Sequence, residues 1–215
     1  MARLLITVLF AVVFVAVLRI QAMDTNLLSK KFLKKREVHG RTKRSPILHG
    51  RAKRSLLSQD EKDAFLNAHN NDRERTQANP KLRDMVWNNN LAKMAQAWSD
   101  KCVFAHGQPA GIESGFAHVG QNLYIMSGSP VIRPDGKAVS EYWHAEVQFY
   151  NPQTNTCSGT CGHYTQEVWS ATTDLGCGMT FCPVVKDVFN NAWIVTCNYG
   201  PAGNFDGERP YQAEG

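Results

Sequence analysis

Two histidines and one glutamate stand where they could carry out chemistry. His106 and His163 each follow a cysteine by a few residues, so a disulfide would fix the backbone beneath each imidazole. Glu146 comes three residues after Trp143, and on a helix its carboxylate would border the face that the tryptophan buries. Two imidazoles and a carboxylate could bind a divalent cation such as zinc. The same residues could equally have purely structural roles, and the histidines alone favour that interpretation.

Other residue types give no catalytic assignment. The chain has neither a G-x-S-x-G elbow nor an H-E-x-x-H motif, and cysteines held in disulfides cannot act as nucleophiles. His69 lies on the inner side of the first expected helix, which predicts a hydrogen-bonded core residue. His118 and His144 have no partner at a telling spacing and are expected at the surface.

The segment Cys161–Gly178 presents His163. It begins with a short helical pattern that exposes His163 at one end and buries Val168 and Trp169. Turn residues follow, and then an apolar run typical of a strand. The segment is therefore either one wall of a site or a pinned core helix.

The elements that must position these residues form an α+β pattern. Ser58 and Glu61 make a capping box, which predicts a helix that begins there. Apolar residues at helical spacing predict two more helices, and a hairpin turn is expected at Asn190–Asn191. The expected helices span about 58–75, 90–101 and 137–150, and the expected strands 121–126, 175–185 and 192–199. Helices first and strands mainly late favour helices stacked on a small antiparallel sheet.

In the third expected helix, Trp143 and Val147 share the face predicted to be buried.

The N-terminus is expected to be removed. Residues 1–22 have the apolar run and the small residue of a signal peptide, and no later stretch is apolar enough to anchor the chain in a membrane. Residues 23–54 are basic and contain two R-x-K-R patterns that resemble convertase sites and end at Arg44 and Arg54. The prediction is a propeptide at 23–54 and a mature domain at 55–215.

Removing that segment reverses the charge. Residues 1–54 hold 13 of the 24 basic and 2 of the 19 acidic residues, which leaves 11 basic and 17 acidic residues and a net charge of −6 for 55–215. A domain of that sign has no general attraction for nucleic acid or anionic lipid. It holds all six cysteines, and in an oxidising compartment these are expected to form three disulfides.

Two longer motifs carry a resemblance to a known family. GHYTQEVWSAT at Gly162–Thr172 and IVTCNYGPAGNF at Ile194–Phe205 resemble the diagnostic motifs of the CAP superfamily, which comprises cysteine-rich secretory proteins, antigen 5 and pathogenesis-related class 1 proteins. HNNDR, CVFAH, GQNLY and WHAE extend the resemblance over nearly all of the mature chain. The resemblance implies an α-β-α sandwich with a central cleft.

The resemblance also implies a ligand set and a disulfide pairing. Family members can hold zinc or another divalent cation on two histidines and two acids, which here implies His106, His163 and Glu146. Gln121 stands where the second acid is expected, so weaker metal binding is implied. Glu167 replaces a residue that is usually aliphatic. The implied disulfides are Cys102–Cys182, Cys177–Cys197 and Cys157–Cys161.

The expected function is therefore that of a secreted, non-enzymatic protein that binds a sterol, another lipid or a protein partner, in defence, venom or reproduction. The apolar residues Ile112 and Phe116 in a glycine-rich loop motivate the lipid interpretation. Two alternatives stay open: a metal-dependent hydrolase or protease, with Glu146 as general base, and a toxin-like or allergen-like ligand of a receptor. A monomer or weak dimer without nucleic acid is expected, with at most a weakly bound divalent cation such as zinc.

Overall fold

The computed structural model describes residues 53–54, 56–186 and 188–213. The predicted signal peptide and nearly all of the predicted propeptide, including Arg44, lie outside the described residues. The described residues belong to one compact unit, Leu48–Gly215. None of their helices has the length and apolar character needed to cross a membrane.

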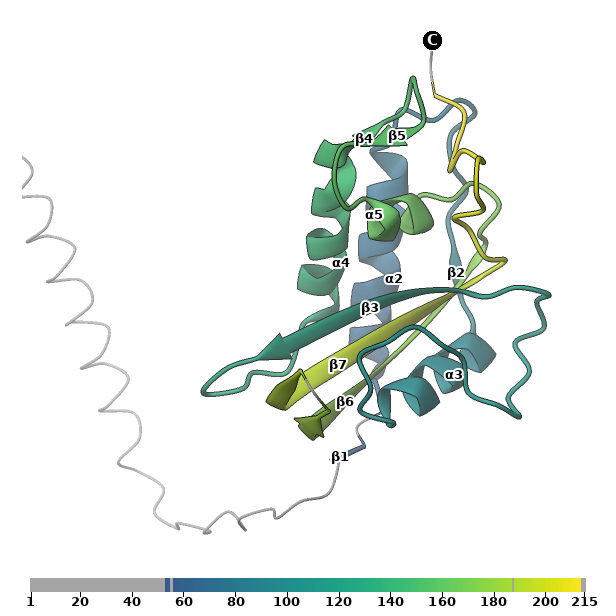
Figure 1. Cartoon of the computed structure of the whole chain (residues 1–215). Helices are drawn as coiled ribbons and strands as arrows, with labels where there is room; N and C mark the ends of the chain where they lie inside the picture. The colour runs from purple at the N-terminus through teal and green to yellow at the C-terminus, as the bar shows by residue number, and fades with distance from the viewer. Residues whose placement is uncertain (1–52, 55, 187, 214–215) are drawn as a thin grey trace, which may run out of the picture. The chain divides into compact units, whose positions relative to one another are not determined.

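Figure 1 shows the helices and strands of the described residues. The helices are α2 (Gln59–Glu74), α3 (Asn89–Ser99), α4 (Gly136–His144) and α5 (Gly162–Glu167), with a 3-10 helix, η1, at Ala145–Phe149. The strands are β1 (Lys53–Arg54), β2 (Val86–Trp87), β3 (Gly120–Ser127), β4 (Tyr150–Asn151), β5 (Thr156–Cys157), β6 (Asp174–Val185) and β7 (Phe189–Gly200).

Each long helix begins at a side chain that accepts hydrogen bonds from its first turn. The capping box predicted at Ser58 and Glu61 is confirmed, and both of its reciprocal bonds are present. Asn88 caps α3 and Asp135 caps α4 in the same way. The starts of the helices are therefore set by local sequence.

The main sheet has the order β1-β6-β7-β3, and β2 adds to β6 in parallel. The long strands β6 and β7 form an antiparallel hairpin, and β3 lies antiparallel on the far side of β7. The register sets Gln121 of β3 opposite Asn198 of β7. This pairing brings Gln121 to the place where the cleft forms.

The sheet lies between two helical layers (Figure 1). Helices α2, α4 and α5 cover one face, and α3 covers the other. Gly176 and Gly178 of β6 allow α3 to approach, because a Cβ on either would collide with the α3 backbone. Side chains such as Phe65, Trp143 and Met179 fill the core on the opposite face. The predicted α-β-α arrangement is confirmed.

The third helix differs from its prediction. It is regular only to His144 and then continues as the 3-10 helix η1. A 3-10 helix has about three residues per turn, so positions beyond His144 rotate away from the face that α4 buries. Trp143 is fully buried, whereas Val147 is 40% exposed. The prediction that these two share a buried face is therefore wrong.

The hairpin turn is also displaced from its prediction. Asn190 and Asn191 lie within β7, and residues 186–188 connect the two strands. Asn191 takes a positive φ of 52°, which asparagine tolerates, at a point where the ladder skips Pro183 on the partner strand. Proline has no N–H to donate, which accounts for the missing pair between Pro183 and Asn191.

The three implied disulfides are all present: Cys102–Cys182, Cys157–Cys161 and Cys177–Cys197. The second closes a short loop directly before α5 and so fixes the start of the helix that carries His163. Cys177–Cys197 joins β6 to β7 in the core.

Candidate functional site

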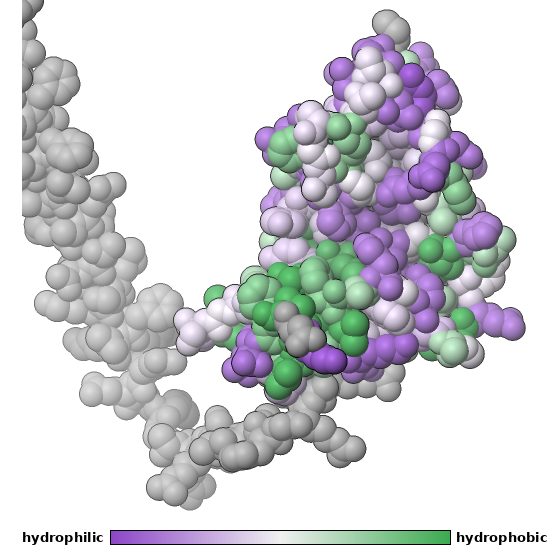
Figure 2. Space-filling model, viewed as in Figure 1, coloured by the Kyte–Doolittle hydropathy of each residue, from purple (hydrophilic) through white to green (hydrophobic). Residues whose placement is uncertain are grey.

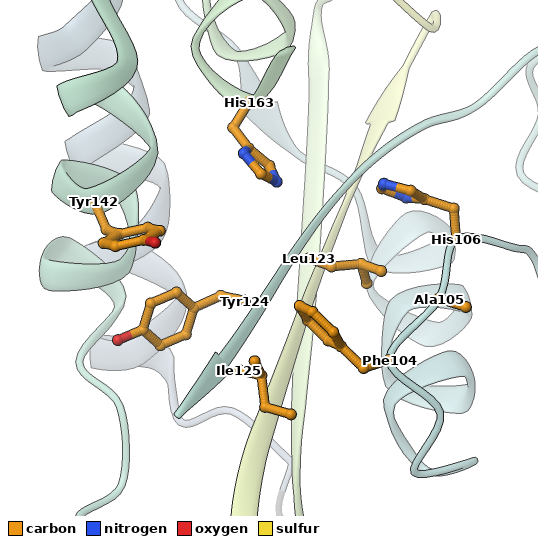
Figure 3. A pocket seen from close by; sticks show the side chains of 8 residues that line it. All are labelled: Phe104, Ala105, His106, Leu123, Tyr124, Ile125, Tyr142 and His163. Atoms are coloured by element: carbon orange, nitrogen blue, oxygen red, sulfur yellow. The ribbon is translucent and has the colours of Figure 1, made fainter. Parts of the chain in front are cut away.

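A cleft of about 490 Å³ opens between α4, α5, β3 and the segment after α3. Its walls are mainly apolar or aromatic, and two imidazoles lie at one end (Figure 3). The lining residues are Phe104, Ala105, His106, Leu123, Tyr124, Ile125, Tyr142 and His163. On the face shown in Figure 2, apolar side chains gather over the part of the sheet formed by β3, β6 and β7 in Figure 1.

His163 is held rigidly at the start of α5. Its imidazole stacks on the Trp143 indole, with the ring centroids 6.0 Å apart and the planes 15° from parallel. Its Nδ1 lies 2.6 Å from Glu146 Oε1, and its backbone N–H donates to Glu146 Oε2 at 2.9 Å. Glu146 thus pairs with one of the two cleft histidines.

This pairing decides which ring nitrogen faces the cleft. A carboxylate only accepts hydrogen bonds, so Nδ1 of His163 carries the proton that it shares with Glu146. Nε2 is then the unprotonated nitrogen of the neutral ring. Both oxygens of Glu146 are engaged in holding His163, which makes the glutamate a positioning residue.

Gln121 is also fully engaged. Its Nε2 donates to the Gly107 carbonyl at 2.7 Å, and its Oε1 accepts from the Gly107 N–H at 3.1 Å. Oε1 also lies 3.2 Å from His106 Nδ1, and Nε2 donates to Asn198 Oδ1 at 3.2 Å. A glutamate could not donate to the Gly107 carbonyl. The amide at position 121 therefore fits this backbone better than the acid that the motif implies.

The two cleft histidines face each other across β3 in Figure 3. Their free nitrogens could share one cation, with Glu146 as the partner that orients His163. Within the described residues, however, His106, His163 and Glu146 do not bring three ligand atoms within 4.8 Å of one another. The ligand set that the resemblance implies is therefore not brought together in the part of the chain that the structure describes.

A buried polar chain supports the cleft from below. Asn122 donates to the His163 carbonyl at 3.1 Å and to the Tyr199 hydroxyl at 3.0 Å. The hydroxyl lies 2.8 Å from His69 Nε2, and His69 Nδ1 lies 2.8 Å from the Phe65 carbonyl. Burial lowers the pKa of His69 to about 4, so its ring is neutral. The prediction of a hydrogen-bonded core histidine is confirmed.

Glu167, whose direction the sequence left open, points away from the cleft lining. Its carboxylate is fully buried and lies with Asp72 of α2 and His144 of α4, and the ligand atoms of the three are within 4.8 Å of one another. We call these three residues the buried trio. His144 is 17% exposed and packs edge-on against Tyr164. The prediction that it is a surface group is wrong, whereas His118 is exposed as expected.

Burial dominates the electrostatics of the buried trio. Burial raises the pKa of Asp72 to about 6, although Arg75 opposes the shift, and it raises the pKa of Glu167 well above the usual range. The charge of Asp72 raises the pKa of Glu167 further. Burial also lowers the pKa of His144 to about 4. All three groups are driven toward their neutral forms.

The cleft walls contain residues that the sequence did not single out. Phe104, Tyr124 and Tyr142 form much of the lining. Each lies inside or directly beside a quoted motif, so an exposed aromatic next to a motif histidine or glutamate was the available signal. Ile112 and Phe116, which motivated the lipid interpretation, do not line the cleft. The Phe116 ring instead packs against Gly200.

Comparison with known proteins accounts for this arrangement. Residues 66–199 match the family model described as "Cysteine-rich secretory protein family", named CAP. The chain belongs to the CAP family. The match spans the whole of the first motif, the second motif as far as Tyr199, and every residue of the cleft and the buried trio.

Two curated CAP relatives illustrate the extent of the similarity. GLIPR1-like protein 1 of Mus musculus is 40% identical over 156 residues, which cover 69% of this chain and 63% of that protein. Venom allergen 5.02 of Dolichovespula maculata is 36% identical over 176 residues, which cover 73% of this chain and 78% of that protein. The chain thus spans a little under two thirds of the length of the mouse relative.

Solved structures share the fold. Venom allergen-like protein 4 of Schistosoma mansoni superposes with a TM-score of 0.58 at 27% identity, over 74% of this chain and 97% of that one. A structure described as NaASP2 with Zn2+ superposes with a TM-score of 0.51 at 25% identity, over 74% and 88%. The sandwich and its three layers are therefore those of CAP proteins.

Proposed function

We propose that this CAP protein is a secreted, non-enzymatic binding protein whose cleft takes a sterol or another amphiphilic lipid. The observation that carries the proposal is the composition of the cleft. Phe104 and Ile125 form an apolar wall, while His106 and His163 supply polar groups at one end. A volume of about 490 Å³ is within the range of small-molecule sites, which are mostly apolar with a few polar groups.

Exposure of the wall supports this proposal. Phe104 is 37% exposed and Tyr142 is 62% exposed, although both belong to one concave surface. Binding of a ligand to a concave apolar surface is favourable because it removes that surface from water. An amphiphile would lay its hydrocarbon on Phe104 and Ile125 and direct its hydroxyl or carboxylate toward the imidazoles.

The engagement of Glu146 argues against the hydrolase interpretation in which this glutamate is the general base. A general base must be free to take a proton from water or substrate. Glu146 instead uses both oxygens to hold His163, and Gln121 uses its amide to hold Gly107. The cleft is preorganised around these bonds, which suits a site that recognises one end of a ligand.

A binding assay with a matched pair of variants tests the proposal. Radiolabelled cholesterol and a radiolabelled fatty acid are titrated into the purified chain, into Phe104→Ser and into Phe189→Ser. Phe189 is 46% exposed at the start of β7 and does not line the cleft, so it serves as the control. Contact with one phenylalanine is worth about 1.5 to 3 kcal/mol, which predicts roughly tenfold or greater weakening for Phe104→Ser alone. Absence of saturable binding over a broad lipid panel would contradict the proposal.

The competing hydrolase interpretation makes a different prediction. It requires peptide or ester turnover that depends on a divalent cation and is abolished by His163→Ala. A receptor ligand would instead keep its activity in Phe104→Ser. The zinc in the NaASP2 structure motivates the first of these comparisons, and that zinc belongs to that protein.

Secretion and processing are part of the same proposal. Membership of a family of secretory proteins and three disulfides support export to an oxidising compartment. We expect loss of residues 1–22 and cleavage after Arg44 or Arg54, of which Arg54 lies in β1 on the edge of the sheet. N-terminal sequencing of the chain from culture medium should give Ser45 or Ser55, and recovery of an uncleaved Met1 terminus from cells alone would contradict it.

A further inference from the structure

The cleft leaves one group of ionisable side chains unused. The buried trio comes from three helices: Asp72 from α2, His144 from α4 and Glu167 from α5. Within the described residues it is the one group of three or more histidine, cysteine or carboxylate side chains whose ligand atoms lie within 4.8 Å of one another.

Glu167 has no hydrogen-bond partner although it is fully buried. Neither carboxylate oxygen is bonded. His69 Nε2 lies 3.5 Å from Oε1, but that nitrogen is already engaged by the Tyr199 hydroxyl. The neutral His69 ring forms no ion pair. Buried carboxyl groups without partners are rare because losing hydration is costly, so this group needs a ligand.

The other two members also keep atoms free. Asp72 Oδ2 has no partner, while Oδ1 accepts from Arg75. His144 Nδ1 has no hydrogen-bond partner and lies 3.6 Å from Asp72 Oδ1. Three helices thus converge on one point with four unsatisfied atoms, all of them potential metal ligands.

We propose that the buried trio is a structural binding site for a divalent transition cation, with zinc as the best fit. One imidazole nitrogen and two carboxylates form a ligand set that zinc accepts, and a water molecule would complete four-coordination. Two ligands of a tetrahedral zinc are about 3.3 Å apart, since each bond is about 2.0 to 2.2 Å long. The trio is within about 1.5 Å of that spacing, and no hydrogen bond restrains Glu167.

Charge and access agree with this assignment. Two carboxylates and a neutral imidazole would balance a dication, which leaves no net charge in the interior. The partner of Asp72 is Arg75, whose side chain is 60% exposed and can swing into solvent. His144 is 17% exposed, so one side chain of the trio reaches the protein surface. Calcium and magnesium favour six or more oxygen ligands, which the trio does not offer.

The site is separate from the cleft. None of the three residues lines the cleft, and His106 and His163 are not members of the trio. A cation here would tie α2, α4 and α5 together and so fix the helix that presents His163. The role that follows is structural support of the cleft wall.

Zinc titration of purified full-length chain tests the proposal. The chain is stripped with chelator and titrated with Zn²⁺ against a chromophoric competitor, with Ca²⁺ and Mg²⁺ in parallel. Glu167→Val and His144→Phe each remove one potential ligand and fill its place with an apolar side chain. Glu167→Gln keeps the shape, and the double variant His106→Ala/His163→Ala removes the cleft imidazoles. Glu141→Gln is the control, because Glu141 is an exposed acid on α4.

The expected result separates the two sites. Zinc affinity falls at least about tenfold in the Glu167 and His144 variants, and it is retained in the cleft double variant and in Glu141→Gln. X-ray absorption of the zinc complex should show one imidazole and oxygen ligands. Equal affinity in all variants, loss only in the cleft double variant, or no zinc binding by the wild type would overturn the proposal. Circular dichroism of Glu167→Gln and Glu167→Val verifies that loss of affinity is not loss of fold.

Discussion

The cleft and the buried trio are built on the same short helix and differ in how their polar groups are satisfied. His163 begins α5 and faces the cleft, where Glu146 and Gln121 use their polar atoms in hydrogen bonds. Glu167 ends α5 and faces the interior, where its carboxylate has no partner. His163 and Glu167 thus lie only four positions apart in one six-residue helix, although the polar groups around the first are hydrogen-bonded and the carboxylate of the second is not.

The difference shows that exposure and readiness to bind an ion are separate properties. The open site has fixed donors and acceptors, so its free surface is mostly apolar and suits a hydrocarbon ligand. The buried trio has free ligand atoms in a low-dielectric interior, where their electrostatic attraction for a cation is strongest. The same fold therefore offers two kinds of binding site at the two ends of one helix.

Removing the hydrogen bonds between Glu146 and His163 beside the cleft should have the largest effect on stability. Glu146→Ala leaves the Nδ1–H and the backbone N–H of His163 without their acceptor, in a place where the imidazole is only 26% exposed. Hydrogen bonds to charged groups are worth about 1.5 to 3 kcal/mol, so we expect a loss of about 2 to 4 kcal/mol in the free energy of unfolding. Urea denaturation measures it. Glu141→Ala, a substitution of an exposed acid on α4, should change it by less than about 0.5 kcal/mol, and equal losses would contradict the account.

Removing the unpartnered carboxyl group of Glu167 should instead increase the stability of the fold. With chelator present, Glu167→Val replaces a buried carboxyl group without partners by an apolar side chain. A buried polar group without a hydrogen-bond partner costs about 1 to 3 kcal/mol, so we expect a gain of about 1 to 3 kcal/mol. Urea denaturation of both proteins at neutral pH measures the gain. A clear loss of stability would show that Glu167 has a partner in solution.

The pH dependence should sharpen the same contrast. The pKa of Glu167 is raised well above its usual range, so the folded chain binds a proton that the unfolded chain releases. Such a group contributes stability at low pH that is lost as the pH rises through the folded pKa. His69 and His144, with pKa values near 4, contribute stability that grows between about pH 4 and 6.5 and is constant above it.

As the pH rises above 4.5, the ordinary pKa of a glutamate, the wild type should therefore lose stability relative to Glu167→Val. Asp72, His69 and His144 are present in both proteins, so the comparison isolates Glu167. One proton of difference corresponds to about 1.4 kcal/mol per pH unit at most. Denaturation of both proteins in chelator from pH 4.5 to 8.5 measures the difference, and parallel curves over the whole range would contradict the burial of an unpartnered Glu167.

Restoring the acid in the cleft should have the smallest effect on stability. Gln121→Glu removes the bond to the Gly107 carbonyl and sets a carboxylate against that oxygen. We expect a loss of about 1 kcal/mol and a gain in zinc affinity at His106 and His163. Thermal denaturation and zinc titration measure the two effects. A gain of stability would show that the hydrogen bonds between the Gln121 amide and the Gly107 backbone do not stabilise the fold.

Much of the fold was predictable from local sequence. The capping box at Ser58, the strand at Gln121 and the buried histidine His69 follow from patterns of a few residues. The change from α4 to a 3-10 helix was not predictable, because the bond between Glu146 and His163 depends on a segment 17 residues away. The extension of the hairpin to Val185 and Phe189 depends likewise on pairing between two strands and not on a local turn signal.

The candidate site was only partly predictable, for the same reason. Motif spacing identified His106, His163 and Glu146, which the structure places in or beside the cleft. It could not show that Gln121 binds the Gly107 backbone or that Glu167 meets Asp72 and His144. Those contacts join residues of α2, α4 and α5, and Gln121 with the loop at Gly107, which are distant in sequence. The directions of these side chains are therefore visible only in the structure.

The most direct test of the account is the position of a bound zinc ion. Crystals of the purified chain are soaked in Zn²⁺, and diffraction is recorded on both sides of the zinc absorption edge. The account predicts an anomalous peak between Asp72, His144 and Glu167, with no stronger peak in the cleft. A single peak between His106 and His163, with none at the trio, would contradict the separation of an apolar cleft from a buried cation site.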